Sequence, residues 1–475
     1  MRRVSGPLRA GAPSNPGAAT RRVAPGVSRL KSASVRGGAS LVLLSILFWL
    51  IFYQNAPPNF GLNWELADQP TMFQATTAAV DTANTEDRII KICTLLISIY
   101  VVVSRWSTMR LLVKESNLGA IACLTLAPLS AVWSIEPSAT LLRSVTLLTI
   151  AFLCLAISLA GWNRRRLQQL VLPPLMFILI MSLLLGLMFP DRITELGQDL
   201  SQKGAWHGMT FTKNQFGMIS SVAAIICVNR LIAGEGRIAW PLAGTLVSLT
   251  CLTLSRSNTS LFATLLGIGF MALVMRVPVV KQRFSTHVVV AIAATILLYE
   301  LVIQNVIPGA YTLLAPIRSL TGKDATFSAR TTIWDIVKQH IQYAPILGSG
   351  YGAYWIGPVA RSPSYVFTYV MYFYPTEAHN GYLDIVNDLG WFGMGCLVLF
   401  LIAYMRQALQ LMRFDRSQAA LYLALLFQQM VMNMSESEWF ARDSAFTIML
   451  LAITCLSRAL QEARASARLA AAPAS

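Results

Sequence analysis

The feature that most constrains this chain is a series of long apolar runs that carry almost no charge. A helix needs about 20 apolar residues to cross a bilayer, with a range of about 17–25. Twelve runs approach or meet this length, at residues 38–54, 89–105, 117–133, 139–161, 167–189, 214–232, 238–254, 259–276, 286–304, 389–405, 418–433 and 444–459. The sequence therefore predicts an all-α polytopic membrane protein with about twelve transmembrane helices.

The composition supports the same class. Hydrophobic residues make up 55% of the 475 residues and charged residues only 13%, whereas a typical soluble domain has roughly 25% charged residues. A soluble protein of this size would need that charge to cover its surface, so the excess apolar residues must face lipid. This excludes a secreted domain, a disordered chain and a soluble enzyme with a single anchor.

The charge distribution predicts the orientation. Lys and Arg number 38 against 22 acidic residues, a net charge of +16. On a soluble protein this excess would suggest nucleic acid, but in a membrane protein basic residues gather in cytoplasmic loops. With the N-terminus inside, every predicted cytoplasmic turn is basic, at residues 105–114, 164–166, 230–237, 276–283 and 406–416. We therefore expect both termini in the cytoplasm and no nucleic-acid partner.

The chain divides into one membrane domain and two tails. Residues 1–37 are rich in Gly, Ala, Pro, Ser and Arg and carry no acid, which predicts a disordered basic cytoplasmic tail. Residues 38–460 form the transmembrane domain, and residues 461–475 a second cytoplasmic tail. The largest polar segment, residues 305–388, is predicted to be a large periplasmic loop containing short helices.

Two features stand out within this loop. Residues 330–341 read as an amphipathic helix with Ile333, Trp334 and Val337 on one face, and Ser328 as its N-cap. The glycines of residues 348–352 alternate, and this spacing matches neither the P-loop nor the dinucleotide-binding fingerprint. We interpret them as a structural turn, with a ligand-contacting turn as the alternative.

Common catalytic and metal motifs are absent from the sequence. The seven Cys lie in apolar runs, where they behave as small buried hydrophobes, so neither disulfides nor a cysteine metal cluster is expected. No Ser-His-Asp, HExxH or Walker pattern occurs. Carriers often place an ionisable group in mid-span, but the one candidate acid, Glu300, is near the end of its run. This favours a membrane enzyme that faces outward over a carrier.

Ionisable residues at the predicted outer ends of the runs are the candidate site. Arg256 lies in the polar hexapeptide of residues 255–260, where it could bind an anion through paired hydrogen bonds or anchor a helix end. His379 precedes the tenth run, and a neutral imidazole accepts a proton near neutral pH. Glu436 and Glu438 follow the eleventh run and could orient the arginines, remain solvated or, least favoured, hold a metal.

Four stretches resemble a known family in their order, spacing and predicted outward side. They are similar to the O-antigen ligase and polysaccharide polymerase superfamily of bacterial inner-membrane glycosyltransferases, over about residues 211–440. The stretches are residues 211–217 (FTKNQFG), 255–261 (SRSNTSL), 329–334 with 345–352 (ARTTIW and PILGSGYG), and 379–383 with 389–393 (HNGYL and LGWFG).

The resemblance implies the chemistry. The donor would be a glycan on undecaprenyl diphosphate in the outer leaflet, passed to an acceptor hydroxyl without nucleotide, metal or other cofactor. No nucleophile for a covalent intermediate is evident, so inversion is expected. The implied location is the bacterial inner membrane with the active site facing the periplasm. Membrane lipids and the lipid-linked glycan are the expected partners, and contacts with other polysaccharide assembly and export proteins are left open.

The resemblance also implies roles for residues. Arg256 and Arg330 would bind the diphosphate as negative charge grows on it, and His379 would activate or orient the acceptor hydroxyl. These three form the expected catalytic set. The expected substrate-binding set is Lys213, Asn214, Asn380, Glu436, Glu438, Tyr351 and Trp355, the last two as stacking surfaces for sugars.

Two activities within the family, and two outside it, stay open. The hexapeptide of residues 255–260 looks closer to the exopolysaccharide polymerase branch, which favours a polymerase of lipid-linked repeat units. A ligase would instead transfer finished polysaccharide to lipid A core or to protein. A lipid-linked glycan flippase would need an ion path through the bundle and not His379, and a scaffold would tolerate loss of all three catalytic candidates.

Overall fold

A computed structural model describes residues 37–55, 85–195, 204–234, 236–306, 328–371 and 374–471. The predicted N-terminal tail therefore lies almost wholly outside the described residues. In the described part every regular element is a helix, and no strand occurs there. The all-α class is confirmed.

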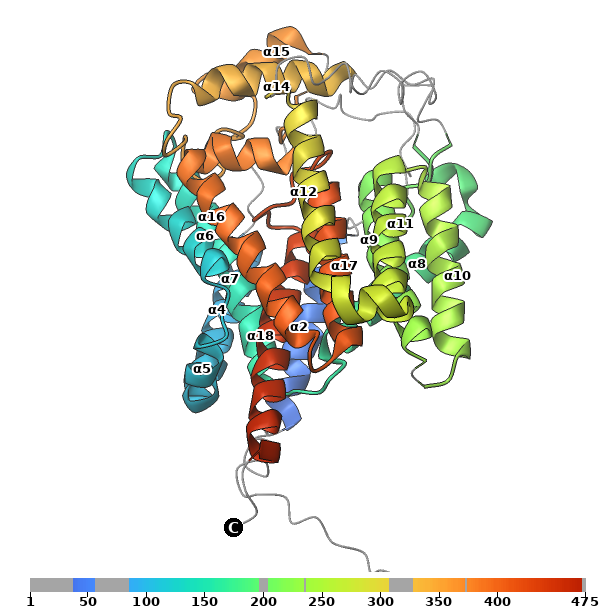
Figure 1. Ribbon diagram of the computed structural model, residues 1–475. Helices are drawn as coiled ribbons and strands as arrows, with labels where there is room; N and C mark the ends of the chain where they lie inside the picture. The colour runs from blue at the N-terminus through green and yellow to red at the C-terminus, as the bar shows by residue number, and fades with distance from the viewer. Residues whose placement is uncertain are drawn as a thin grey trace, which may run out of the picture.

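The helices stand side by side as a bundle whose labels follow the chain (Figure 1). The first half comprises α2 (Gly37–Asn55), α4 (Thr85–Ser104), α5 (Trp106–Val113), α6 (Leu118–Leu129), α7 (Pro137–Ala160), α8 (Arg166–Met188), α9 (Lys213–Ala233) and α10 (Ala239–Ser255). The second half comprises α11 (Asn258–Arg276), η3 (Val280–Phe284), α12 (Ser285–Ile303), α14 (Ser328–Ile341), α15 (Phe367–Val370), α16 (Gly381–Leu411), α17 (Arg416–Met432) and α18 (Ser444–Ala471).

Each of the twelve predicted runs falls on a helix, but fewer of these helices are long and apolar enough to count as spans. Seven helices in the described residues meet that standard, or eight if α4 and α5 form one span bent by 86°. Shorter apolar helices occur at Val42–Asn55, Leu118–Val132 and Ala239–Ser255. The structure thus establishes a multi-helix membrane protein, while the number twelve stays a prediction.

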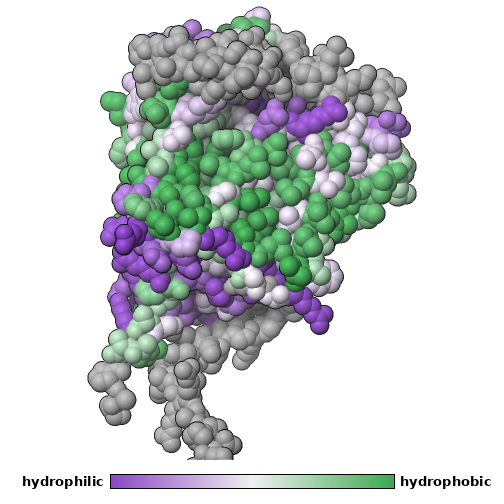
Figure 2. All heavy atoms as spheres, turned by 45° about the vertical axis from the view of Figure 1, so that its right-hand side comes forward, coloured by the Kyte–Doolittle hydropathy of each residue, from purple (hydrophilic) through white to green (hydrophobic). Residues whose placement is uncertain are grey.

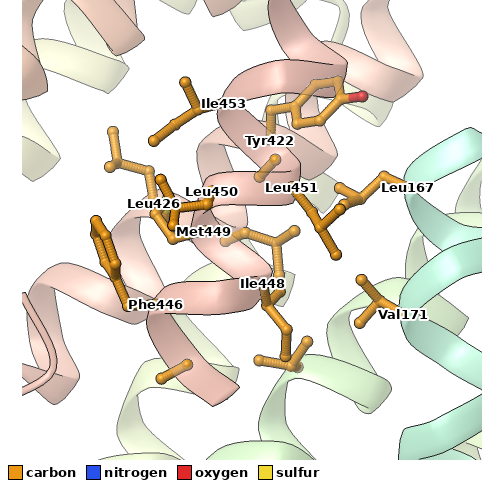
Figure 3. Close-up of a cluster of buried hydrophobic side chains, with 14 of the residues drawn as sticks. Leu167, Val171, Tyr422, Leu426, Phe446, Ile448, Met449, Leu450, Leu451 and Ile453 are labelled. Carbon is orange, nitrogen blue, oxygen red and sulfur yellow. The ribbon is translucent and has the colours of Figure 1, made fainter. Parts of the chain in front are cut away.

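Helix α17 is not among the seven apolar helices, although it lies inside the bundle. It has 17 residues, and nearly all of them are buried, including Gln418, Gln428 and Gln429. A helix enclosed by protein does not need a lipid-facing surface, so amides are tolerated where other groups surround them. Helix α18 is similarly central, since 83% of its most apolar window is buried. Around these two helices, Leu451 of α18 and Tyr422 of α17 lie near Leu167 of α8 in the core (Figure 3).

Short polar side chains set several helix starts. Thr212 accepts a hydrogen bond from Gln215 N at the start of α9, and Asn380 accepts one from Leu383 N at the start of α16. Asp415 caps α17 in the same way. Each cap satisfies a backbone N–H group that the first helical turn leaves unpaired.

The two ends of the bundle differ in chemistry. A broad hydrophobic band crosses the middle of the molecule, with hydrophilic residues gathered below it and a further group above it (Figure 2). Helices α14 and α15 lie across the top and the C-terminus lies at the bottom (Figure 1). The amphipathic helix predicted at residues 330–341 is confirmed as α14, with Ile333, Trp334 and Val337 buried.

The last helix runs further than its predicted apolar run. Helix α18 continues to Ala471, so most of the segment expected as a C-terminal tail extends the helix below the bundle. Arg458, near the end of the predicted run, forms an ion pair at 2.8 Å with Glu462 of the extension, one turn further along.

Candidate active site

The connection between α17 and α18 carries the carboxylate at the centre of the candidate site. Asn433 ends α17, and its side-chain oxygen accepts hydrogen bonds from Glu438 N at 2.9 Å and Trp439 N at 2.8 Å. A single asparagine amide therefore folds the chain back on itself directly after the helix. This tight turn holds Glu436 at the end of the bundle.

Glu436 gathers side chains from three distant parts of the sequence. Asn214 on α9 donates to its Oε1 at 2.7 Å, and Arg330 on α14 donates to the same oxygen at 2.9 Å. His379, just before α16, places Nδ1 3.4 Å from the other oxygen, Oε2. Burial opposes ionisation of Glu436, but His379, Arg330 and Asn214 together hold its pKa below the ordinary value. The carboxylate is therefore ionised at neutral pH.

His379 sits between two carboxylates. Its Nδ1 lies 3.0 Å from Glu377 Oε1 as well as near Glu436. Burial works against protonation, yet the two acids outweigh it and raise the pKa of His379 to about 10. The imidazole is thus cationic at neutral pH. Its backbone is in the left-handed region, with φ of 50°, which is uncommon for a residue other than glycine.

The start of α16 docks directly onto the Glu436 turn. Gly381 N donates to the carbonyl oxygens of Asn433 and Glu436, both at 2.9 Å. Asn380 N donates to Ser437 Oγ at 3.1 Å, and its side-chain amide donates to Glu300 Oε1 at 2.7 Å. These contacts fix His379, the residue before Asn380, relative to Glu436.

The Arg256 turn packs against α9 close to Asn214. Arg256 links α10 to α11 with φ of 50°. A Cβ on Gly217, three residues after Asn214, would lie 2.7 Å from Ser257 Cβ, so the two backbones approach closely there. The guanidinium of Arg256 lies beside Gly204, 3.9 Å from where a Cβ on that residue would stand. The turn is therefore one helical turn away from the Glu436 cluster along α9.

The remaining predicted residues lie around this cluster in different settings. The backbone N–H of Lys213 donates to Glu195 Oε1 at 3.0 Å. Glu438 is buried and accepts a hydrogen bond from Gln429 of α17 at 2.9 Å, and burial raises its pKa well above the ordinary value. Asn380 is fully buried, with both ends of its amide bonded to protein groups.

Tyr351 and Trp355 are parts of the core. Tyr351 is 6% exposed and Trp355 is 7% exposed. The Tyr351 hydroxyl donates to Phe440 O at 2.5 Å, and the Trp355 indole donates to Asp384 Oδ1 at 2.8 Å. Their rings are therefore packed against protein in this structure.

The glycine-rich turn before Tyr351 is tightly packed against protein. Gly348, Gly350 and Gly352 all have positive φ, and a Cβ on Gly348 would lie 2.4 Å from the backbone of Asp388. Arg143 of α7 donates to Gly352 O and, at 2.7 Å, to Trp355 O. The interpretation of this segment as a structural turn fits these contacts.

One metal-like arrangement occurs among the described residues. Donor atoms of Glu377, His379 and Glu436 all lie within 4.8 Å of one another. However, Arg330 and Asn214 already occupy one oxygen of Glu436. A guanidinium on a ligand oxygen repels a second cation, so these residues fit an ion-paired cluster better than a divalent metal site.

Glu377 is a site residue that the sequence does not single out, although it stands two positions before His379. The signal was present as an acid beside a histidine in a polar stretch. It could not show which acid reaches the imidazole, because Glu436 comes from a connection 57 residues further along the chain.

The fold and this cluster define a multi-pass membrane protein with a charged polar site at one end of its helix bundle. Residues 243–398 match the O-antigen ligase family model. The chain is also 26% identical over 318 residues to the exopolysaccharide production protein ExoQ of Rhizobium meliloti strain 1021, covering 64% of this chain and 68% of that protein. These comparisons confirm the resemblance to the O-antigen ligase and polysaccharide polymerase superfamily. The matched region of the family includes Arg256, Arg330 and His379.

Proposed function

We propose that this protein polymerises lipid-linked oligosaccharide repeat units, transferring a glycan from undecaprenyl diphosphate to an acceptor sugar hydroxyl at the periplasmic face. The observation that carries the proposal is the convergence of Arg330, His379 and Asn214 on Glu436 at one end of the bundle. A phosphate-binding arginine and a histidine at a membrane surface fit a donor whose leaving group is an anionic lipid. The similarity to an exopolysaccharide production protein also supports a role in polysaccharide synthesis.

The proposed orientation follows from the basic turns. Arg164, Arg276 and Arg416 lie together around one pocket, and they come from three of the turns expected in the cytoplasm. Helices α9, α11 and α17 run from that end to the Glu436 cluster or its neighbouring turn. We therefore place the cluster on the periplasmic side of the bacterial inner membrane, with twelve crossings and both termini in the cytoplasm.

In this proposal the arginines bind the diphosphate. The bond from the sugar anomeric carbon to the diphosphate oxygen breaks, and the lipid diphosphate leaves with the bonding electrons. Arg330 and Arg256 stabilise the charge that grows on it. Before the donor arrives, Glu436 neutralises Arg330 and keeps its guanidinium positioned. The N-termini of α9 and α11, beside these residues, add partial positive charge.

His379 positions the acceptor hydroxyl. Because its pKa of about 10 keeps it protonated at neutral pH, it donates a hydrogen bond rather than accepting the hydroxyl proton. That proton passes to a neighbouring carboxylate, for which Glu377 is the nearest candidate at 3.0 Å from Nδ1. The acceptor oxygen then forms the new glycosidic bond with inversion, and no nucleotide or metal enters the reaction.

The other expected residues support this site. Asn214 orients Glu436, Lys213 adds charge at the start of α9, and Asn380 positions His379. Tyr351 and Trp355 hold the large loop in shape from within the core.

A ligase is the second candidate because the matching family model is described as an O-antigen ligase. Such an enzyme would use the same donor chemistry but a different acceptor. The flippase alternative would use the bundle as a path for substrate rather than the Glu436 cluster as a reaction site.

The test is complementation of a strain that lacks the protein, using wild type, Arg256→Ala, Arg330→Ala and His379→Ala, with expression checked for each. We expect single repeat units to accumulate on the lipid and polymer to fall at least about 100-fold. Full-length polymer on the lipid would indicate a ligase. Units trapped on the cytoplasmic side of the deletion strain would indicate a flippase, and wild-type glycan from all three variants would refute the site.

A further inference from the structure

A basic pocket lies at the opposite end of the bundle from the Glu436 cluster. Its volume is about 340 Å³, and its lining comes from four separate turns: Arg164, Ile232, Ala233, Met275, Arg276, Lys281, Phe414, Asp415, Arg416 and Ser417. Helix α9 reaches from one site to the other, with Asn214 at the cluster and Ile232 at the pocket. At about 1.5 Å per residue, these two residues lie roughly 27 Å apart along the helix. The pocket is therefore distinct from the proposed active site.

Internal contacts hold the basic residues around the opening. Arg164 donates to Asp415 Oδ1 at 2.8 Å, which neutralises this one pair. Arg416 donates to Val274 O at 3.2 Å and to Ser285 Oγ at 2.9 Å, and Arg276 donates to Ile232 O. Carbonyl and hydroxyl acceptors leave the charge of a guanidinium uncompensated. Two arginines are thus fixed in place with their positive charge still available.

Two further groups point to a ligand. The Lys281 backbone N–H, on the π-helical turn η3, donates to Val277 O at 2.9 Å, while its ammonium makes no hydrogen bond or ion pair within the described ranges. Ser417 has a buried hydroxyl without a hydrogen-bond partner in the same part of the chain. A buried hydroxyl normally has a hydrogen-bond partner, so we expect a bound molecule to supply one for Ser417. The lining thus offers three uncompensated cations to an anion, and the unsatisfied hydroxyl of Ser417 lies beside them.

The lining also has an apolar part. Ile232, Ala233, Met275 and Phe414 line the same pocket, and Phe414 is half exposed. An inorganic anion needs only the basic residues, whereas a phospholipid carries a phosphate next to its acyl chains. Basic pockets between transmembrane helices on the cytoplasmic side suit anionic head groups.

We propose that this pocket binds the phosphate head group of an anionic phospholipid, held by Arg276, Lys281 and Arg416, with apolar chain along Met275 and Phe414. That the lipid belongs to the cytoplasmic leaflet rests on the orientation proposed above. That its head group is anionic rests only on the residues that line the pocket. Lipid binding in this pocket would tie the turns after α9, α11 and α16 together at the membrane surface.

The test titrates the purified full-length chain in detergent with dioleoylphosphatidylglycerol and follows its thermal unfolding midpoint. We expect a saturable rise that dioleoylphosphatidylcholine and inorganic phosphate do not reproduce. Arg276→Gln with Lys281→Gln should raise the half-saturating lipid concentration by about 30-fold, or about fivefold for each basic residue. If the double variant does not fold, Lys281→Gln alone should raise the half-saturating concentration about fivefold. This variant breaks no hydrogen bond or ion pair of the side chain within the described residues.

The matched control is Arg237→Gln with Arg283→Gln. It removes the same charge from exposed residues at the same end that do not line the pocket. We expect its half-saturating concentration to stay within about threefold of wild type. Equal weakening of the two double variants would overturn the proposal, and so would inorganic phosphate that acts as well as the lipid. Because the titration needs no glycan donor, its failure would leave the proposed transferase function untouched.

Discussion

At the scale of single residues, Glu436 has the contacts of an organising group. One partly buried carboxylate holds an arginine, an asparagine and a histidine from separate segments. A buried charge pair contributes little net stability, but removing one partner leaves the other uncompensated. We therefore expect Glu436 to act by positioning the other side chains. Replacing it should lower the activity more than the stability of the fold.

Glu436→Gln should abolish most polymer formation while the protein is still produced. Glutamine keeps the shape but lacks the charge that positions Arg330 and His379, and a misplacement of about 1 Å can cost about 100-fold in rate. Polymer yield in the complemented deletion strain measures this. Asp335→Asn, an exposed carboxylate on the same helix as Arg330, is the control and should behave as wild type. Wild-type yield from Glu436→Gln would contradict the proposed cluster.

The protonation of His379 should make stability depend on pH. Its pKa is raised from 6.5 to about 10 in the folded protein, so folding favours the protonated form. This contribution is fully present below about pH 6.5 and is lost as the pH rises through about 10. We expect the wild-type unfolding midpoint to exceed that of His379→Gln at pH near 7, with the difference shrinking toward pH 10.5. A difference that does not change with pH would show that His379 is not held as a cation.

At the scale of elements, the start of α16 positions the site by close backbone approach. The chain reaches the Glu436 turn through Gly381, where a Cβ would lie 1.9 Å from Asn433 Oδ1. Further along, Gly390 breaks the helix with φ of 67° and ψ of −170°. The first part of α16 therefore crosses the top of the bundle before the helix turns downward (Figure 1). This break explains why the apolar run predicted at residues 389–405 begins eight residues inside the observed helix.

Gly381→Ala should destabilise the protein by about 1–3 kcal/mol, the usual range for overpacking. The added methyl group displaces Asn433, whose side chain folds the α17–α18 connection. Gly395→Ala is a matched control on the same helix, since nothing beyond the neighbouring backbone of that helix lies within 4 Å of its Cβ position. Thermal unfolding in detergent compares the two variants. Equal midpoints would mean that α16 does not depend on this contact.

At the scale of the whole molecule, the orientation is the property on which the proposed chemistry depends. The two ends of the bundle carry different groups, an ion-paired cluster at one and a basic pocket at the other. A donor in the outer leaflet can reach only one of them. The side that each end faces is therefore a direct test of the proposed function.

Tyr343→Cys should react with a membrane-impermeant thiol reagent from the periplasm, and Arg283→Cys only after the inner membrane is opened. Tyr343 is 86% exposed and lies just beyond α14, so its accessibility depends on the side and not on burial. Cys93 is exposed and is first replaced by alanine, and the parent without added cysteine is the control. The reverse labelling pattern would invert the orientation and refute a periplasmic site.

The sequence alone was enough to predict the helical class, the apolar runs and the amphipathic helix α14. These depend on local composition and periodicity, which a chain carries whatever its partners are. It also pointed to Arg330, His379 and Glu436, because ionisable groups at the ends of apolar runs need partners. Asn214 came from the resemblance to the family.

Only the tertiary structure decided which of these groups meet. Residues 214, 330, 379 and 436 come together because four helix ends pack at one face, and sequence distance carries no information about that packing. Burial likewise decided that Tyr351 and Trp355 face the core and that α17 lies inside the bundle. The protonation of His379 belongs to the same category, because it depends on two carboxylates that the fold alone brings to its ring.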